Sequence, residues 1–557
     1  MDSTAIRKIK PYLEKKIVKG YTYYQLVRKA RINGKVKRVW SKHLGTAEAI
    51  ERVYDERDNL IPNLKIKSFE YGRTAALMNI SEELNFVDIV NNHINKKEVD
   101  GLTVGEYLSL IILGRAYGPL SKNKTSDWFY NSFLNIILSF PHKLNTSNFV
   151  NQMDYLTDNV MEKIQNDIGR RLIELGVKPS TIFFDTTNFF TYIEKGCDLP
   201  SKGKSKEHRY DKNLVGLGMV TSDANVPILS ESYAGKINDA KIFTVIFNKI
   251  VERLVAIGTS CKDMVLVIDR GCNSTDNIKL ILSKMHFVGA AKANQVRDLH
   301  KIPLDRYELL YTIRKHNVFG YRTKKELFGT EFTVIISYNE GSYKKQSATY
   351  ETKKIQILDK LSAIKQSVER KGRGRKKSMK NALIDASKAI PDDYRTVFLF
   401  EDAEGVFTFS VDPKAEKELY RTFGKNVIIT DMHDWSSEKI VKTYTAKDFI
   451  EKDFKWLKNV MLISIKPIFH RKDCRIKVHI FLCVMGLVFY RYLLWKLKKS
   501  DELLSDTEVI EKLENIRVAL VKSGDHEAKF VFETVDVGQA RLFSMLCLGD
   551  VLEGANL

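Results

Sequence analysis

Short apolar runs in the middle of the chain predict the strands of a β-sheet. Residues 181–184 and 265–268 are continuously apolar, as in strands that are covered on both faces. Between them, residues 214–221 and 227–233 flank a short polar turn and predict a hairpin. A helical pattern follows at residues 240–256. The predicted order is therefore three strands, a helix and a fourth strand.

An aspartate closes each of the two apolar runs. Asp185 follows residues 181–184, and Asp269 follows residues 265–268 and precedes Arg270. Acidic residues at the ends of such strands tend to face the crevice in which an open α/β sheet binds its ligands. We therefore expect both carboxylates to face one crevice.

A third carboxylate lies in a cationic segment near residue 450. In YTAKDFIEKDFKWLK, Tyr444, Lys447, Glu451 and Lys458 are spaced three, four and seven residues apart. A helix of about 3.6 residues per turn would carry them along one side. A lone carboxylate on such a face ordinarily pairs with its neighbours. Combined with the two aspartates, however, the element order is that of an RNase H-like nucleotidyl-transfer core.

These residues resemble the DDE transposases of the insertion-sequence-four superfamily, in its branch called sixteen thirty-four. The late signature of that branch is tyrosine, two residues, arginine, three residues, glutamate, six residues and lysine. It falls on Tyr444, Lys447, Glu451 and Lys458. Lys447 departs from the signature, which has arginine at this position. The difference matters because lysine cannot grip a phosphate with the planar bidentate geometry of arginine.

Other stretches resemble the same family in the same order along the chain. Residues 203–220 (GKSKEHRYDKNLVGLGMV) resemble the block after the first aspartate, and residues 235–241 (GKINDAK) resemble a glycine-asparagine-acid turn. Residues 467–491 resemble the closing helix, and residues 20–45 resemble the opening β-meander. The resemblance covers most of the chain and thins after about residue 500.

The resemblance implies that Asp185, Asp269 and Glu451 are catalytic and bind two Mg²⁺ ions, with Mn²⁺ as an expected substitute. Two ions about 4 Å apart can activate the attacking oxygen and stabilise the leaving oxygen of a phosphodiester. Oxygen ligands suit Mg²⁺. We expect Asp185 to bridge both ions, with Asp269 and Glu451 each binding one. The nucleophile would be water for the first cut and then the freed 3′-hydroxyl group.

Residues near the three acids are candidates for contacts with DNA. They are Tyr444, Lys447, Lys458, Arg270, His208 and Arg209. The resembling family uses the positions of Tyr444 and Lys458 to hold the phosphate near the cleaved end. Arg270 adjoins an expected metal ligand and is therefore placed to meet the scissile phosphate. His208 has a simpler alternative as a surface residue of a lysine-rich loop.

The basic run at residues 368–380 is a second candidate for contacts with DNA. Such a run is usually a solvated loop. Its alternative role is to clamp a phosphate backbone. The candidate residues are Arg370, Lys371, Arg373, Arg375, Lys376 and Lys377.

The distance between the second aspartate and Glu451 is too long for a single loop and predicts a folded insertion. Alternating stretches such as residues 332–338 and 396–410 predict that this insertion is mostly β. We expect a multidomain α/β chain with six parts. These are a basic β-hairpin module at 1–66 that turns at Asn33 and Gly34, a helical DNA-end-binding domain at 67–176, the first part of an RNase H-like core at 177–293, a mostly β insertion at 294–430, the Glu helix and closing helix at 431–500, and a C-terminal region at 501–557.

Composition favours a polyanionic partner. There are 90 lysine and arginine residues against 69 aspartate and glutamate residues, which gives a formal net charge of +21. The longest apolar run, residues 480–490, is shorter than the roughly 20 residues of a membrane span, so we expect a core helix and no membrane partner. Six cysteines without CxxC spacing and an N-terminus without an apolar stretch favour a reducing cytoplasm, nucleoid-associated in a bacterium or archaeon.

The predicted function is a DNA transposase that binds the terminal inverted repeats of an insertion sequence. It would cleave at the ends and transfer the 3′-hydroxyl strands to double-stranded target DNA, as a homodimer in a synaptic complex. One alternative is an RNase H-like nuclease or Holliday-junction-type resolvase, which would cut without joining. Another is a DNA-binding protein that has lost catalysis, although the presence of all three acids argues against it. An RNA-binding role has no RNP-like aromatic motif to support it.

Overall fold

The computed structural model divides into two compact units. One comprises Met1–Arg73, Asn131–Ser139 and Ile510–Leu557, and the other comprises Thr74–Tyr130 and Phe140–Val509. The structure describes residues 9–32, 34–59, 64–96, 98, 101–138, 140, 143–292, 295–370, 376–459, 462–500, 504–523 and 527–553.

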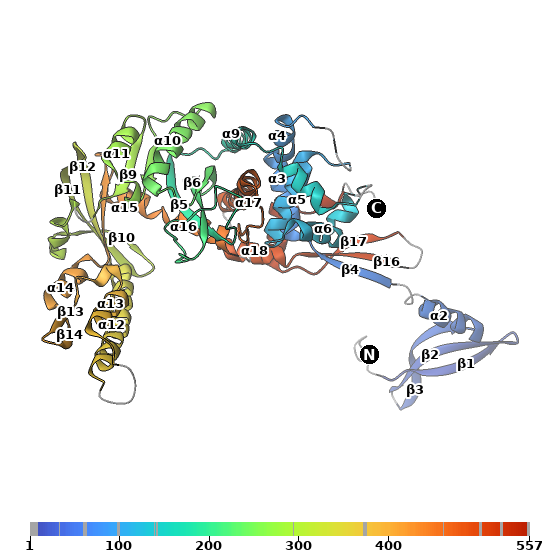
Figure 1. Ribbon diagram of the computed structural model, residues 1–557. Helices are drawn as coiled ribbons and strands as arrows, with labels where there is room; N and C mark the ends of the chain where they lie inside the picture. The colour runs from blue at the N-terminus through green and yellow to red at the C-terminus, as the bar shows by residue number, and fades with distance from the viewer. Residues whose placement is uncertain are drawn as a thin grey trace. The chain divides into compact units, whose positions relative to one another are not determined.

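The first unit begins with an antiparallel meander (Figure 1). Its strands are β1 (Tyr12–Val18), β2 (Tyr21–Ile32) and β3 (Lys35–Gly45), and helix α2 (Ala47–Asn59) follows. The hairpin predicted within residues 1–66 is confirmed as β2 and β3, and β1 extends it to three strands. Gly34, at the turn, has a φ of 74°, a left-handed conformation that favours glycine. Asn33 lies outside the described residues.

A second sheet of the first unit joins distant parts of the chain. Strand β4 (Leu64–Glu70) pairs with β16 (Arg517–Ser523), which also pairs with β17 (Lys529–Phe532). The boundary predicted between residues 66 and 67 therefore falls inside β4. The short helices α7 (Leu134–Ile137), α19 (Val537–Met545) and α20 (Asp550–Glu553) complete this unit.

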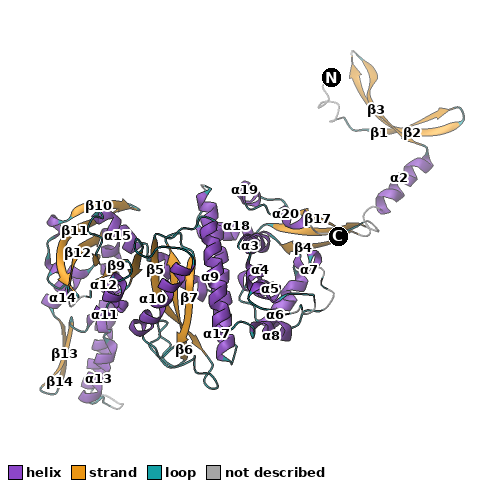
Figure 2. Cartoon of the chain, turned by 90° about the horizontal axis from the view of Figure 1, so that it is seen from above, coloured by secondary structure: helices purple, strands orange, loops and turns teal. Residues whose placement is uncertain are grey.

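Helices form the N-terminal part of the second unit (Figure 2). They are α3 (Gly72–Glu83), which begins in the first unit, α4 (Phe86–Asn92), α5 (Val104–Tyr117), α6 (Lys122–Asn131), α8 (Thr146–Met153) and α9 (Asp158–Glu174). The long helix α17 (Asp473–Lys499) packs on α5 and α9, and α18 (Asp506–Glu514) follows it. By length and composition α17 could cross a membrane, but 94% of its most apolar window is buried inside the protein. The prediction of a core helix at residues 480–490 is confirmed.

A nine-stranded mixed sheet forms the centre of the second unit. Its strand order is β10-β11-β12-β15-β9-β8-β5-β6-β7. The strands are β5 (Thr181–Thr191), β6 (Asn213–Ser222), β7 (Pro227–Ala234), β8 (Val265–Ile268), β9 (His286–Ala290), β10 (Glu308–Ile313), β11 (His316–Leu327), β12 (Thr330–Asn339) and β15 (Lys425–Thr430). Strands β5, β8 and β9 are parallel, and the other pairs are antiparallel. The predicted hairpin is confirmed as β6 and β7.

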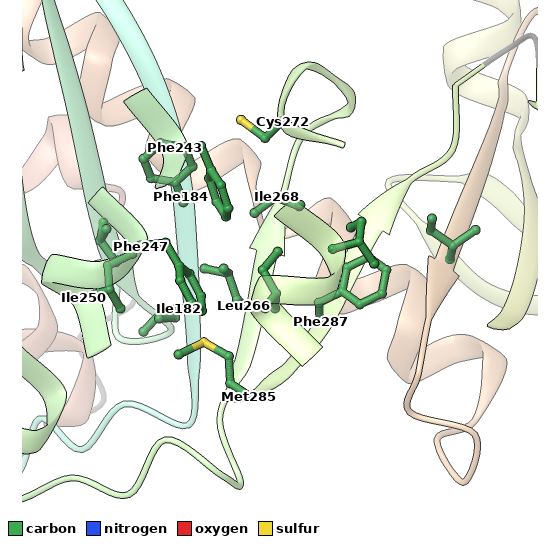
Figure 3. Close-up of a cluster of buried hydrophobic side chains, with 14 of the residues drawn as sticks. Ile182, Phe184, Phe243, Phe247, Ile250, Leu266, Ile268, Cys272, Met285 and Phe287 are labelled. Carbon is green, nitrogen blue, oxygen red and sulfur yellow. The ribbon is translucent and has the colours of Figure 1, made fainter. Parts of the chain in front are cut away.

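Alternate residues of the central strands face helices on opposite sides of this sheet. Ile182 and Leu266 pack with helices α10 (Asp239–Ala256) and α11 (Thr275–Leu282) in a large apolar cluster (Figure 3). Their neighbours Phe183, Val265 and Val267 pack with α15 (Ser437–Thr445) on the other face. Burial of both faces explains why these strands are continuously apolar in sequence.

The prediction of a mostly β insertion is wrong, because helices make up much of residues 294–430. Strands β10, β11, β12 and β15 extend the central sheet instead of forming a sheet of their own. The same interval also contains the 30-residue helix α12 (Glu340–Glu369), α13 (Met379–Ala389) and α14 (Pro413–Thr422). A separate two-stranded hairpin, β13 (Phe398–Ala403) and β14 (Val406–Val411), packs with these helices. The insertion is therefore mixed α/β.

Candidate active site

The two aspartates lie at neighbouring positions of the central sheet, Asp185 within β5 and Asp269 directly after the parallel strand β8. The register of β5 and β8 pairs Phe183 with Val267. Asp185 lies two positions after Phe183, and Asp269 lies two positions after Val267. Because side chains alternate along a strand, both carboxylates share the face on which Phe183 and Val267 meet α15. Backbone register thus brings together two acids that are far apart in sequence.

Asp185 does not end its strand as predicted. Strand β5 continues to Thr191, so Asp185 lies inside it. The residues after Asp185 are largely polar, which hid the continuation. Asp269, by contrast, directly follows β8, keeps an extended backbone and precedes the short 3₁₀ turn Arg270–Cys272.

The single helix predicted for residues 444–458 is two helices. Tyr444 is in the last turn of α15, and α16 (Asp448–Lys458) begins after Lys447. Lys447 donates its backbone N–H to the carbonyl oxygen of Tyr444 at 3.2 Å, which forms the turn between the helices. Glu451 lies in the first turn of α16, and Lys458 is its last residue.

Lys447 is the centre of the site. Its Nζ atom lies 3.2 Å from Oδ1 of Asp269 and 3.4 Å from Oε1 of Glu451, and its side chain is 11% exposed. Burial alone would lower the pKa of this ammonium, but Tyr444 and the three carboxylates outweigh burial and raise the pKa. Lys447 therefore remains charged and joins elements that come from separate parts of the chain.

Burial of Asp185 disfavours its ionised form more than the neighbouring cations favour it. Burial raises its pKa to about 6, although Lys206 and Lys447 attract the ionised form. Its Oδ1 atom accepts the backbone N–H of Thr186 at 2.7 Å. For Asp269 the balance is reversed: burial alone would raise the pKa, but Lys447 and the backbone N–H of Arg270 lower it.

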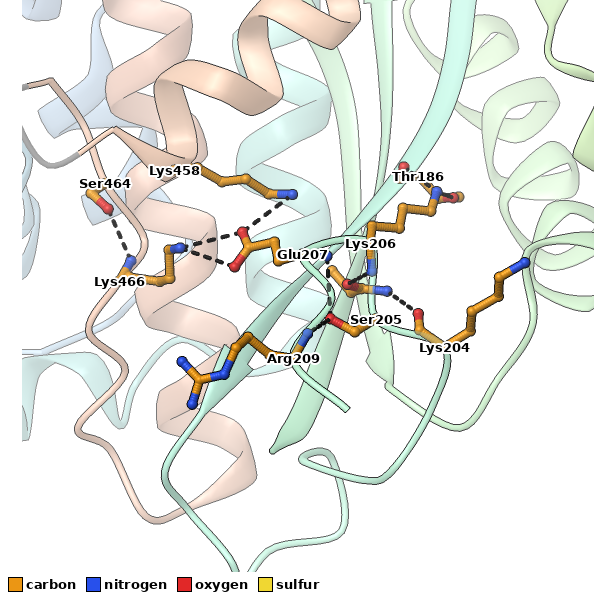
Figure 4. Close-up of polar contacts among 10 residues, drawn as sticks. Thr186, Lys204, Ser205, Lys206, Glu207, Arg209, Lys458, Ser464 and Lys466 are labelled. Atoms are coloured by element: carbon orange, nitrogen blue, oxygen red, sulfur yellow. Dashed lines mark hydrogen bonds and ion pairs between the residues drawn. The ribbon is translucent and has the colours of Figure 1, made fainter. Parts of the chain in front are cut away.

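Lys206, Glu207 and Lys466 are site residues that the sequence analysis did not select. Lys206 donates to the carbonyl oxygen and the hydroxyl of Thr186 at 2.6 and 2.7 Å, next to Asp185 (Figure 4). Glu207 joins Lys458 at 3.3 Å and Lys466 at 3.0 Å. For Lys206 and Glu207 the signal was present in the block at residues 203–220, where they directly precede His208 and Arg209; Lys466 lies outside that block.

The two predicted residues of that block lie in other environments. His208 is exposed, has a left-handed φ of 57° and places its ring near the hydroxyl of Tyr210. Arg209 forms a two-point ion pair with Asp211 at 2.9 and 3.0 Å and lies over the ring of Phe190. The carboxylate of Asp211 thus occupies the face of the guanidinium that would grip a phosphate.

Tyr444 and Lys458 are largely buried, whereas Arg270 is exposed. Tyr444 is 9% exposed, and burial raises its pKa to about 12. Burial lowers the pKa of Lys458 despite its pairing with Glu207. Arg270 is exposed and donates to the Asn426 side chain at 3.1 Å.

The basic run is described only in part. Arg370 follows α12 directly and is exposed, as is Lys376. Lys377 pairs with Asp385 of α13 at 2.6 Å. The predicted contacts Lys371, Arg373 and Arg375 lie outside the described residues.

The chemistry of the three acids suits a divalent cation, although an ammonium lies among them here. In the part of the chain that the structure describes, no three His, Cys, Asp or Glu side chains form a group that could hold a metal ion. The ammonium of Lys447 contacts two of the carboxylates. An oxygen-only donor set with one poorly compensated carboxylate fits Mg²⁺ better than a softer metal.

Comparison with protein-family models gives no match, and comparison with curated proteins gives none. Among solved structures, the chain is similar to a piggyBac transposase in a synaptic complex with hairpin DNA. The sequence identity is 11%, the TM-score is 0.34, and 79% of each chain is covered. A likeness at this level assigns neither fold nor activity.

Proposed function

We propose that this protein is a DNA transposase that uses DDE chemistry. The observation that carries the proposal is the gathering of Asp185, Asp269 and Glu451 around one lysine, from β5, the end of β8 and α16. A structural salt bridge needs one carboxylate for one ammonium. At this site the pKa of buried Asp185 is raised to about 6 although Lys206 and Lys447 lie near it, which supports a site for additional positive charge.

The strand order supports an RNase H-like core for this site. Within the central sheet, β7, β6 and β5 are antiparallel neighbours, and β8 and β9 continue in parallel beside β5. The acids lie on the first and fourth of these strands in sequence and on a later helix. That is the element order expected for nucleotidyl transfer by three carboxylates.

Each residue has a distinct role in this proposal. Asp185, Asp269 and Glu451 would hold Mg²⁺, and Mn²⁺ is expected to substitute. Bound Mg²⁺ would supply positive charge to the oxygens of the reacting phosphodiester. With Mg²⁺ between the carboxylates in place of its ammonium, Lys447 would turn that ammonium toward a non-bridging phosphate oxygen. Lys458, already in a charged cluster with Glu207, would contact the neighbouring phosphate.

The partners follow from charge and from the resemblance. A net charge of +21 favours double-stranded DNA as the polyanion. We propose that the sequences bound are the terminal inverted repeats and a target site, with a homodimer holding two ends together. The reducing, nucleoid-associated cytoplasm of a bacterium or archaeon would be the location.

The decisive experiment is an assay of cleavage and strand transfer on labelled DNA that carries the element's ends and flanks. Wild type would be compared with Asp185→Asn, Asp269→Asn and Glu451→Gln, with Mg²⁺, Mn²⁺ or EDTA. Asp448→Asn is the matched control, because Asp448 is an exposed acid of the same helix as Glu451.

We expect the wild type and Asp448→Asn to cut and join with either metal. The three site variants should bind the ends in a gel-shift assay without cutting them. Cutting by the wild type without joining would favour a nuclease or resolvase. Binding without any cutting would favour a catalytically silent DNA-binding protein, and cutting by a site variant would remove that residue from the metal ligands.

A further inference from the structure

A second site with uncompensated positive charge lies in the helical part of the second unit. A cavity of about 320 Å³ is lined by Arg115, Lys122, His470, His479 and the exposed Phe469, among others. None of the described residues that line it is acidic. The nearby Asp154 is already paired with Arg475 at 2.6 Å.

Arg115 provides unused hydrogen-bond donors at this cavity. It lies in the last turn of α5, is 2% exposed, and donates from Nη1 to the carbonyl oxygen of Leu120 at 3.1 Å. Its buried Nε and Nη2 atoms have no partner among the described residues. A buried guanidinium with unpaired donors and no carboxylate is costly unless an anion completes it.

Lys122 supplies a second cation whose orientation is fixed. The Nε2 atom of His479 lies 2.8 Å from the carbonyl oxygen of Ile465, so Nε2 carries the proton and donates it. The Nδ1 atom of His479 therefore accepts from Nζ of Lys122 at 3.1 Å. Lys122 keeps further N–H groups for another acceptor. Burial and the neighbouring Arg115 lower the pKa of Lys122 to about 7, as expected for an ammonium without a counter-ion.

Two helix N-termini add to the positive potential. Lys122 is the first residue of α6, and Thr146, the first residue of α8, also lines the cavity. Unpaired N–H groups and helix dipoles at such ends favour anions. At the opening, the side chain of Phe469 is 66% exposed and can cover a planar or apolar group.

We propose that this cavity binds the terminal phosphate of a nucleotide or of a DNA strand, with Arg115 and Lys122 on the phosphate and Phe469 against the attached nucleoside. The volume is at the lower end of the range of small-molecule sites and exceeds the needs of a bare phosphate. A duplex cannot enter it, whereas a strand end can. The proposal is independent of the function proposed above, because none of these residues belongs to the three-acid site.

The test is calorimetric titration of the full-length protein. The probes are inorganic phosphate, a 5′-mononucleotide, and a trinucleotide with and without a 5′-phosphate. The variants are Arg115→Gln, Lys122→Met and Phe469→Ala. Lys124→Met is the matched control, because Lys124 is an exposed residue of the same helix.

We expect the mononucleotide and the 5′-phosphorylated trinucleotide to bind, and the unphosphorylated one to bind much more weakly. Arg115→Gln and Lys122→Met should weaken binding by about tenfold to a hundredfold, as for loss of one hydrogen bond to a charged group. Lys124→Met should leave it unchanged. Phe469→Ala should weaken binding of the mononucleotide but not of inorganic phosphate.

Thermal unfolding without ligand adds a readout that separates binding from structure. Lys122→Met removes a buried cation and also the donor to Nδ1 of His479, so a retained melting transition is the criterion that this variant is folded. Equal binding of the two trinucleotides by the wild type would overturn the proposal, even if every variant failed to fold. So would unchanged affinity in both cation variants, or binding of inorganic phosphate alone.

Discussion

Replacing Asp185 by asparagine should stabilise the protein at neutral pH when divalent metal is absent. Asp185 is partly buried, and burial raises its pKa from 3.8 to about 6. At pH 7.5 the folded chain must therefore ionise a carboxyl group in surroundings that disfavour the charge. Asparagine has nearly the same shape, and its Oδ1 atom can still accept the N–H of Thr186. The substitution removes the unfavourable charge and keeps this contact.

The magnitude of this stabilisation follows from the difference in the pKa of Asp185 between the folded and the unfolded chain. A rise from 3.8 to about 6 corresponds to about 3 kcal/mol, since one pKa unit is about 1.4 kcal/mol. Because the folded pKa is raised, the favourable contribution of protonated Asp185 is fully present below the unfolded pKa and is lost as the pH rises through about 6. Wild type and Asp185→Asn should therefore be equally stable near pH 3.8 and diverge between this pH and about 6.

The free energy of local opening should be measured by hydrogen exchange of the amides of β5 and β8 in EDTA, because a chain of 557 residues need not unfold in one step. Asp211→Asn is the control. The pKa of Asp211 is lowered to about 2 by its pairing with Arg209, so its loss should give no stabilisation. If Asp185→Asn proved less stable than wild type at pH 7.5, the carboxylate would be a structural residue and our interpretation of the site would be wrong.

Three further substitutions test the surroundings of the site. Lys447→Gln should lower the melting temperature in EDTA, because two carboxylates lose their shared ammonium, and should increase the stabilisation by Mg²⁺; equal melting temperatures in EDTA would contradict this. Asp453→Ala should cost about 3 kcal/mol in the free energy of opening, measured by hydrogen exchange of the α16 and α17 amides, by leaving buried Arg491 of α17 short of one partner, whereas Asp448→Ala should cost less than about 1 kcal/mol. Glu207→Gln should release its two lysine partners and steepen the salt dependence of DNA binding measured by fluorescence anisotropy; an unchanged slope would place those lysines away from DNA.

The central strands could be predicted because local pattern determines them. Strands β5 and β8 are buried on both faces and read as unbroken apolar runs, and the turn between β6 and β7 separates two clear strands. The pattern failed at Asp185, where polar residues suggested a strand end. Thr186 and Thr187 are buried instead of exposed to solvent, and β5 continues through them.

Long-range pairing could not be predicted from local pattern. Strands β4 and β16 come from opposite ends of the chain, and β15 returns after the whole insertion to pair with β9. Helix α12 was missed for a different reason. Most of its faces are polar, and its buried residues follow a sparse helical stripe of Tyr350, Ile357, Leu361, Ile364 and Val368. Because α12 has few apolar positions and lies between two stretches with clear strand patterns, the sequence pattern predicted it to be part of a β domain.

The environment of Lys447 explains why a lysine fits at this position. Lys447 lies at the break between α15 and α16 and must reach two carboxylates from different elements. A compact ammonium on a flexible stem can contact both, whereas a planar guanidinium would favour a two-point grip on one of them. Lysine thus suits the proposed site, in which the same ammonium would hold the acids together before metal binds. The same flexibility makes it a point charge toward phosphate, so an arginine at this position should bind one carboxylate more tightly and the metal less readily.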